Sequence, residues 1–268
     1  MYNFKYHSPS SIEESVDIFN RSEFPKYLAG GMTIIPSMKQ NLSTPSDLID
    51  LQNINELNGI KLSKKSSIII GALTTHNQIS KSLLIKQNIN GLAFLASKIA
   101  DNAIRNIGTI GGSICNADPA ADYPAALLAL DATIFTNKRD IKAEDFFVDM
   151  FETCLESNEI VKFIAFPIKK NSFYLKVSSQ ASKYAIIGMF GTLLDQKLRI
   201  AVTGATNKVF LIEELSKLSL EKLKNFNFSK LNLAHLNINN DIHASADYRK
   251  SLIIKKIPHL IDKLLRNE

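Results

Sequence analysis

Two glycine-rich segments, far apart along the chain, constrain its fold and function more than any other feature. They are Ala29–Thr33 (AGGMT) and Gly108–Ser113 (GTIGGS). Each follows a predicted regular element and presents successive backbone N–H groups without a Cβ in the way, an arrangement that can hold an anion such as a diphosphate. Either segment alone is also explained by a tight turn, because glycine is the usual turn residue. Neither segment matches the G-x-G-x-x-G or P-loop pattern, so a nucleotide site of those two types is not indicated.

The length and composition predict a globular protein of at least two domains. The chain has 268 residues, of which 45% are hydrophobic and 22% charged. Its 2 cysteines form no C-x-x-C pair, so no disulfide framework and no metal site of its own is expected. The apolar runs are far shorter than the ~20 residues of a membrane span, and the N-terminus lacks the apolar core of a secretory signal. A cytoplasmic location is therefore expected.

The net charge of +6 and the pI near 9.1 raise the question of nucleic acid binding. The lysines are scattered along the chain, no aromatic residues alternate with them, and there is no tryptophan to stack on bases. Solvated surface explains such scattered charge better than a binding patch does. No nucleic acid partner is expected.

Hydrophobic periodicity predicts the elements of the first part of the chain. A capping box at Ser11–Glu14 begins a helix over about 11–20, and Leu92 to Ala103 show the spacing of a buried helix. The stretch 105–113 contains too much glycine for a helix. Short strands are expected at 27–29, 47–51, 60–62 and 67–72, with a helical turn at 34–39. The spacing predicts a small parallel βαβ unit in roughly the first 60 residues.

The second part is predicted to change character after 166–171, where proline, lysine and asparagine interrupt the pattern. Before this boundary, Pro124 opens a short helix and strands are expected at 133–136 and 159–166. After it, strands are expected at 173–178, 184–194 and 198–205, followed by helices near 211–218 and 219–225. A final helix should run from 246 to about 265, and Pro258 should kink or split it.

Few side chains outside the glycine segments indicate chemistry. Asp122 precedes a predicted helix start, where a carboxylate can either cap the helix or accept hydrogen bonds from ligand hydroxyls. The five histidines are dispersed, so surface or capping roles are expected and no metal site is assigned. There is no Gly-x-Ser-x-Gly motif, so a hydrolase is not indicated, and no acid–base catalytic residue is assigned.

Long stretches around both glycine segments resemble a known family. The most similar are 27–60 (YLAGGMTIIPSMKQNLSTPSDLIDLQNINELNGI), 99–134 (IADNAIRNIGTIGGSICNADPAADYPAALLALDATI), 145–167 and 241–252. They are similar to the FAD-binding medium subunit of the molybdenum hydroxylases, the group that contains the aerobic carbon monoxide dehydrogenase and xanthine dehydrogenase flavoproteins. The resemblance covers essentially the whole chain, and the combination of Ala-Gly-Gly near residue 30 with Thr-Ile-Gly-Gly near residue 110 is highly specific.

The resemblance implies an α+β fold in two domains. Residues 1–168 would form a two-part FAD-binding domain of the p-cresol methylhydroxylase type, subdivided near residue 60. Residues 169–268 would form a smaller α+β C-terminal domain of the carbon monoxide dehydrogenase flavoprotein type.

The resemblance also implies which residues bind the cofactor. In this family the first glycine segment wraps the FAD diphosphate and the second closes on it from the other side. Asp122 matches a carboxylate near the adenosine ribose, Lys176 a lysine close to the isoalloxazine, and Tyr184 an aromatic residue that covers the ring. The full set is Ala29, Gly30, Gly31, Met32, Thr33, Ile34, Ile99, Ala100, Thr109, Ile110, Gly111, Gly112, Ser113, Asp122, Val161, Lys176 and Tyr184.

The function implied by the resemblance is electron transfer. The chain would be an oxidoreductase subunit that passes electrons from partner iron–sulfur clusters through noncovalent FAD to an acceptor. Molybdopterin and 2Fe-2S clusters would belong to a large and a small partner subunit of a heterotrimer, which could pair into a dimer. The chain departs from the family at Met32, at Ser113 and in the arginine-free stretch 177–183. Two alternatives stay open: a flavin-free, non-catalytic module that retains the fold, and a self-contained FAD oxidoreductase.

Overall fold

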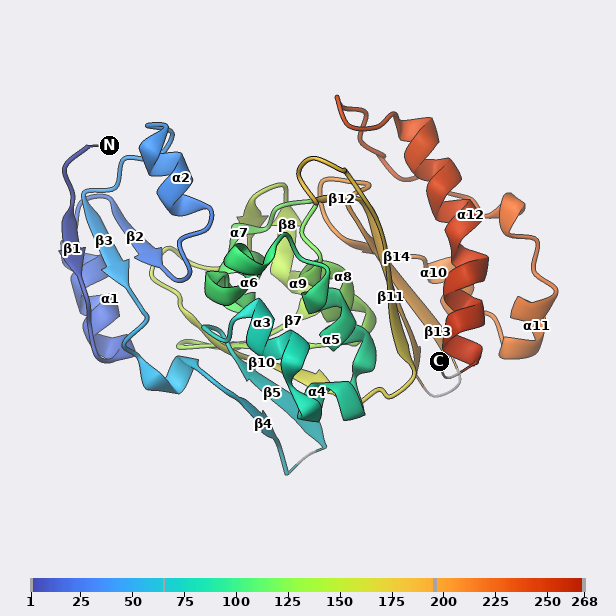
Figure 1. The fold of residues 1–268 in the computed structure, drawn as a ribbon, viewed down its shortest axis with the longest axis horizontal. Helices are drawn as coiled ribbons and strands as arrows, with labels where there is room; N and C mark the ends of the chain where they lie inside the picture. Colours follow the sequence, from blue (N-terminus) through green and yellow to red (C-terminus); the bar gives the residue numbers. More distant parts are fainter. Residues whose placement is uncertain (1, 65, 195–196, 267–268) are drawn as a thin grey trace.

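The computed structural model describes residues 2–64, 66–194 and 197–266. Figure 1 shows three parts side by side along the long axis: an N-terminal sheet with two helices, a central sheet with many short helices, and a C-terminal sheet with the last helix.

The N-terminal part is a three-stranded parallel sheet in the order β1-β3-β2. Its elements are β1 (Lys5–His7), α1 (Ile12–Arg21), β2 (Pro25–Leu28), α2 (Ile34–Lys39), β3 (Asp47–Asp50) and the 3-10 helix η1 (Asn55–Leu57). Ser11 caps α1 by accepting a hydrogen bond from the backbone N–H of Glu14 at 3.1 Å. The predicted parallel βαβ unit is confirmed by β2, α2 and β3.

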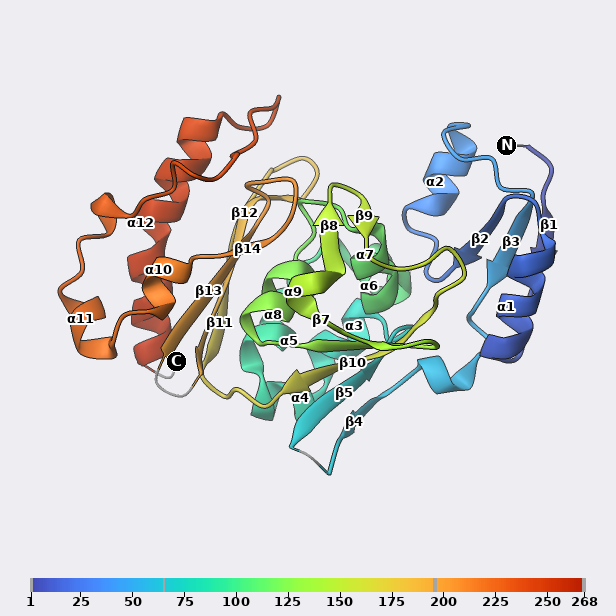
Figure 2. The same ribbon diagram turned by 180° about the vertical axis from the view of Figure 1, so that it is seen from behind.

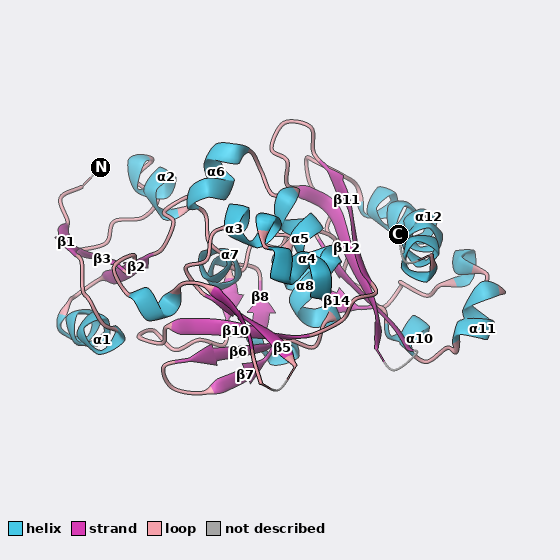
Figure 3. Ribbon diagram, turned by 60° about the horizontal axis from the view of Figure 1, so that its bottom comes forward, coloured by secondary structure: helices cyan, strands magenta, loops and turns pink. Residues whose placement is uncertain are grey.

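The central part is a five-stranded antiparallel sheet in the order β4-β5-β10-β6-β7. Its strands are β4 (Ile60–Leu62), β5 (Ser67–Gly71), β6 (Thr133–Thr136), β7 (Asp140–Lys142) and β10 (Val161–Pro167), and a separate hairpin is formed by β8 (Phe147–Asp149) and β9 (Glu152–Thr153). The helices are α3 (His76–Lys81), α4 (Leu83–Asn88), α5 (Asn90–Ser97), α6 (Asn102–Ile107), α7 (Ile110–Asn116), α8 (Tyr123–Ala129) and α9 (Ala143–Phe146). Figures 2 and 3 show these helices gathered on one face of the sheet. Alternate strand residues such as Ile68, Ile70 and Ile164 are fully buried beneath them.

The stretch 105–113 departs from the prediction, because α6 and α7 fill most of it. Asp101 caps α6 and Thr109 caps α7, each by accepting from a backbone N–H in the first turn. Gly111 lies so close to Ala72 that a Cβ there would come within 2.7 Å of its carbonyl oxygen. The glycine therefore serves the packing of a helix and not a loop. The single helix predicted from Leu92 to Ala103 is divided into α5 and α6, because the chain turns between them at Ala100, which has φ +41°.

The C-terminal part is a four-stranded antiparallel sheet in the order β11-β12-β13-β14. Its elements are β11 (Ser172–Ser178), β12 (Ala185–Leu194), β13 (Lys197–Thr203), β14 (Phe210–Leu211), α10 (Glu213–Ser216), α11 (Leu220–Lys224), the 3-10 helix η2 (Phe228–Lys230) and α12 (Ala246–Leu265). The helix predicted near 211–218 is shorter than expected, because the chain first adds β14 to the sheet. Pro258 does not split α12, which is one continuous helix.

The C-terminal sheet lies between two layers. On one side α12 packs on β11 and β12, and on the other side α5 and α8 pack on β11, β12 and β13. Tyr174 and Phe190 of this sheet belong to the same buried apolar cluster as the central helices. Among residues 2–64, 66–194 and 197–266, no helix has both the length and the apolar character needed to cross a membrane.

Candidate functional site

A cleft of about 1200 Å³ runs between the N-terminal and central parts and reaches the C-terminal part at Tyr184. Its walls include both glycine segments. All but two of the cofactor-binding residues implied by the resemblance line it: Ala29, Gly30, Gly31, Met32, Thr33, Ile34, Ile99, Ala100, Thr109, Gly111, Gly112, Ser113, Asp122, Val161 and Tyr184. The exceptions are Ile110, whose side chain is fully buried in the core, and Lys176. The volume exceeds the ~300–1,000 Å³ of ordinary small-ligand pockets.

The first glycine segment forms a turn between β2 and α2, and it is the predicted anion cradle. Gly31 has φ +70°, a conformation that glycine adopts without strain. Across the described parts of the chain, no acceptor is found for the five consecutive backbone N–H groups of Gly30–Ile34. Unpaired N–H groups in sequence form a concave site for an anion, as the sequence predicts for this segment.

The second glycine segment does not offer its N–H groups in the predicted way. Ile110 donates to the carbonyl of Thr74 at 3.1 Å, and Gly111 donates to the carbonyl of Ala72 at 2.8 Å. Gly112 donates to Oγ1 of Thr109 at 3.1 Å, and Ser113 to the Thr109 carbonyl at 3.0 Å. The capping of α7 and its packing thus use these four donors. This segment presents surface to the cleft, and Ser113 is one of the lining residues.

The two segments converge, as the diphosphate hypothesis requires. A Cβ on Gly30 would lie 2.2 Å from the carbonyl oxygen of Ile107 and 2.9 Å from Cα of Gly108, so the chains touch backbone to backbone. Gly112 faces Ala29, whose Cβ would be 3.5 Å from an added Cβ. Gly30 therefore permits a close approach of two chain segments.

Asp122 does not cap α8, so the capping alternative is wrong. Its carboxylate accepts a hydrogen bond from the hydroxyl of Tyr174 and pairs with Nζ of Lys176 at 2.9 Å. All three groups are buried, and burial raises the pKa of Asp122 while Lys176 and Tyr174 oppose that rise. Asp122 and Lys176 are direct partners, so their side chains lie at one place beside the cleft. Their contacts with the adenosine ribose and with the isoalloxazine stay predictions.

The apolar wall at Ile99 and Ala100 is held by an arginine that the sequence does not single out. Nη1 of Arg105 donates to the carbonyl oxygens of Ile99 at 2.6 Å and of Ala100 at 2.8 Å. These bonds fix the left-handed turn at Ala100. The positions of Ile99 and Ala100 in the cleft thus depend on a side chain from α6.

Two further groups in the cleft wall are missed by sequence reasoning. His76 is buried, 5% exposed, although surface or capping roles are predicted for the histidines. The buried carboxylate of Glu159 accepts hydrogen bonds from Arg139 and Thr136. Because each partner is distant in sequence, no local pattern reveals these groups. Among the described residues, no cluster of three or more His, Cys, Asp or Glu side chains could hold a metal ion.

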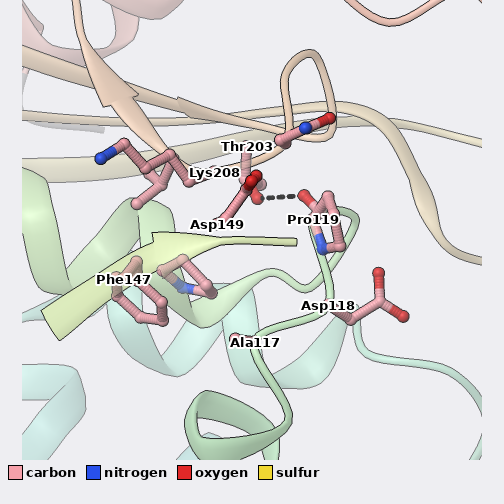
Figure 4. A pocket seen from close by; sticks show the side chains of 10 residues that line it. Ala117, Asp118, Pro119, Phe147, Asp149, Thr203 and Lys208 are labelled. Atoms are coloured by element: carbon pink, nitrogen blue, oxygen red, sulfur yellow. Dashed lines mark hydrogen bonds between the residues drawn. The ribbon is translucent and has the colours of Figure 1, made fainter. Parts of the chain in front are cut away.

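A second, much smaller cavity of about 10 Å³ lies where the C-terminal sheet meets the segment before α8, and Figure 4 shows its lining. This volume holds about one water molecule and no larger ligand. At its edge Oγ1 of Thr203 donates to the carbonyl oxygen of Pro119 at 2.8 Å, and the backbone N–H of Gly204 donates to the same oxygen at 2.8 Å. The end of β13 thereby anchors the segment that leads to Asp122.

A cleft of this size with a run of backbone donors on its wall is typical of proteins that bind a phosphorylated cofactor. Residues 2–169 match the family described as "FAD binding domain in molybdopterin dehydrogenase", and the chain belongs to this family. FAD is therefore its cofactor, and its relatives are dehydrogenase subunits.

Three comparisons give the extent of the likeness. The glyceraldehyde dehydrogenase medium chain of Sulfolobus acidocaldarius is 32% identical over 267 residues, 93% of this chain and 94% of the relative. The carbon monoxide dehydrogenase medium chain of Hydrogenophaga pseudoflava is 37% identical over 169 residues, 61% of this chain and 58% of the relative. A solved structure of carbon monoxide dehydrogenase from the same organism has a TM-score of 0.91 at 28% identity and covers 99% of this chain and 98% of that chain. The resemblance to the carbon monoxide dehydrogenase flavoproteins is thus confirmed.

Proposed function

We propose that the chain is the electron-transferring FAD subunit of a molybdenum hydroxylase. The observation that carries this proposal is the run of five backbone N–H groups at Gly30–Ile34, which have no acceptor among the described residues and lie in a cleft large enough for a dinucleotide. These donors fit a diphosphate without any charged side chain. The oxidoreductase class of the relatives supports the same function.

When bound, FAD supplies redox chemistry that accepts electrons singly and releases them in pairs. The residues of this chain bind and orient it. Gly30–Ile34 would hold the diphosphate, and Thr109, Gly112 and Ser113 would close the cleft beside it. Ile99, Ala100 and Val161 would supply apolar walls that exclude water, and Tyr184, which lines the cleft and is 49% exposed, would cover a ring. Asp122, buried and paired with Lys176, would contribute its carboxylate to the wall of the site.

The medium-chain names of the relatives support an assembly with partner subunits. In the proposed heterotrimer, a small subunit carries iron–sulfur clusters and a large subunit carries molybdopterin, and electrons enter this chain from the clusters. The proposed domains are a two-part FAD-binding domain of the p-cresol methylhydroxylase type, residues 1–168 divided near residue 60, and a C-terminal domain, residues 169–268. The complex is proposed to act in the cytoplasm.

The visible spectrum of the purified full chain tests the cofactor assignment. We expect oxidised-flavin bands that dithionite bleaches, and FAD that is released on denaturation. Gly31→Ala forces a side chain into the left-handed conformation of the cradle and should weaken FAD binding by about tenfold, ~1.4 kcal/mol. The matched control is Gly59→Ala, also at positive φ (+104°) but with open space around it and outside the cleft lining.

Each alternative predicts a different result. A folded, colourless chain that takes up no added FAD would contradict the proposal and favour the flavin-free module. Stopped-flow reduction by a small-molecule donor, equally fast without co-expressed partner chains, would favour the self-contained oxidoreductase. Electron transfer as proposed requires that reduction depend on those partners.

A further inference from the structure

His76 is a buried histidine beside the cradle whose role the fold does not explain. It is the first residue of α3, and its backbone N–H donates to the carbonyl oxygen of Gly108 at 3.0 Å. A Cβ on Gly108 would come within 2.8 Å of Nε2 of His76, and a Cβ on Gly30 within 2.9 Å of Cα of Gly108. Gly108 is therefore a close neighbour of both the Nε2 edge of the imidazole and the first glycine segment.

The hydrogen bond on the other ring nitrogen fixes the tautomer. Nδ1 of His76 lies 3.1 Å from the hydroxyl of Tyr123, which is fully buried. Within the described residues this hydroxyl has no other partner. If Nδ1 carried the proton, the phenolic O–H would be a buried donor without an acceptor, which folded proteins avoid. The Tyr123 hydroxyl therefore donates to Nδ1, and the ring proton resides on Nε2.

The same surroundings keep the ring uncharged. Burial, and to a lesser extent the nearby guanidinium of Arg105, lower the pKa of His76 to about 4. Nε2 has no hydrogen-bond partner among residues 2–64, 66–194 and 197–266, although His76 lines the cleft. A neutral, oriented N–H donor is thus available to a ligand.

We infer that His76 is a cofactor-binding residue, whose uncharged imidazole donates its Nε2–H to an oxygen of the diphosphate held by Gly30–Ile34. The inference rests on the proposed function and adds a side chain that the resemblance does not assign. Tyr123 acts as a positioning residue, because it touches His76 but does not line the cleft.

Binding of three probes to the apoprotein tests this assignment: FAD, ADP, which keeps the diphosphate, and riboflavin, which lacks it. His76→Phe should weaken FAD and ADP about tenfold or more, the usual effect of losing a hydrogen bond to a charged acceptor, and leave riboflavin unchanged. His76→Gln retains a neutral N–H donor and should restore most of the affinity. Tyr123→Phe should cause a smaller loss, and adding it to His76→Phe should cause none.

Several results would overturn the inference. Unchanged FAD and ADP affinity in folded His76→Phe protein means that His76 serves only the packing of Tyr123. A loss for riboflavin but not for ADP places the acceptor on the flavin. If the wild-type chain binds no FAD, the proposed function itself fails, whereas normal wild-type binding with an unaffected variant removes only the role of His76.

Nitrogen-15 NMR of the histidine side chains reads the tautomer of the free protein without folded His76→Phe protein, and ADP can then be added. The resonances missing from the His76→Gln spectrum identify His76. We expect the Nε2–H tautomer at neutral pH in the wild type, a mixture with Nδ1–H in Tyr123→Phe, and a shift of the Nε2 proton when ADP binds. A protonated ring or the Nδ1–H tautomer in the wild type would contradict the inference.

Discussion

Glu159 shows how one buried carboxylate can hold a wall of the cleft. Its side chain is fully buried and accepts hydrogen bonds from Nε and Nη2 of Arg139, both at 3.1 Å, and from the hydroxyl of Thr136 at 2.7 Å. The backbone N–H of Glu156 donates to it at 2.9 Å. Burial alone would raise the pKa of Glu159, but these hydrogen bonds outweigh it and hold the pKa below its ordinary value.

Acid should therefore destabilise the protein partly through Glu159. A carboxyl group with a lowered pKa in the folded state contributes stability above its unfolded pKa of about 4.3, and this contribution is lost as the pH falls through the folded pKa. Glu159→Gln should lower the free energy of unfolding by about 1–3 kcal/mol at pH 7 and flatten its fall below pH ~4. Urea denaturation at several pH values measures both effects.

The matched control for that measurement is Glu156→Gln, in an exposed ion pair with Lys138 whose loss should change stability by less than about 1 kcal/mol. Equal pH profiles for wild type and Glu159→Gln would contradict the role of the buried carboxylate.

At the scale of elements, the crossing of the two glycine segments controls the cleft. Gly30→Ala would push Cβ into the carbonyl oxygen of Ile107, so the turn after β2 and the end of α6 must separate. We expect a loss of about 1–3 kcal/mol of stability together with weaker FAD binding. Thermal unfolding with and without FAD measures both effects.

The control for Gly30→Ala is Gly59→Ala. The Cβ added at Gly59 meets no atom within 4 Å, so this variant should retain its FAD affinity. Unchanged FAD affinity in Gly30→Ala would show that the close approach does not shape the cleft.

The sequence predicts an element correctly where residues close together in the chain determine its structure. It fails where contacts between distant parts of the chain determine the structure. The cap at Ser11 and the βαβ unit follow from residues close together in the chain. The helix α7 is missed because its glycines suggest a loop, whereas Thr109 caps the helix and Ala72, on the strand-to-helix turn after β5, supplies its close neighbour. The ion pair of Asp122 with Lys176 joins two parts of the fold, and no local pattern reveals it.

At the scale of the whole molecule, the central and C-terminal parts share one core. Tyr174 and Phe190 lie in the central apolar cluster, and Arg199 of β13 donates to the carbonyl oxygens of Leu128 and Ala129 at the end of α8, at 2.9 and 3.0 Å. These parts should therefore unfold in one calorimetric transition. Arg199→Met should lower its midpoint by several degrees, because each hydrogen bond from a charged donor contributes about 1.5–3 kcal/mol.

Arg266→Met, at an exposed pair with Asp262, is the control and should leave the midpoint almost unchanged. Two separate transitions for the full chain would show that the C-terminal part is energetically independent.

The anchoring of the segment before α8 by the end of β13 limits how this protein can be recombined with its relatives. Asp122 takes its partners Tyr174 and Lys176 from β11, and Pro119 takes its donors from Thr203 and Gly204. Consider a chimaera in which residues up to about 168 come from this protein and the rest comes from a relative. Asp122 and Pro119 would then lose their hydrogen-bond partners unless the relative has the same residues at positions 174, 176 and 203. A functional chimaera should therefore keep the segment before α8 together with its partners in β11 and at the end of β13, and not simply exchange the two domains at residue 168.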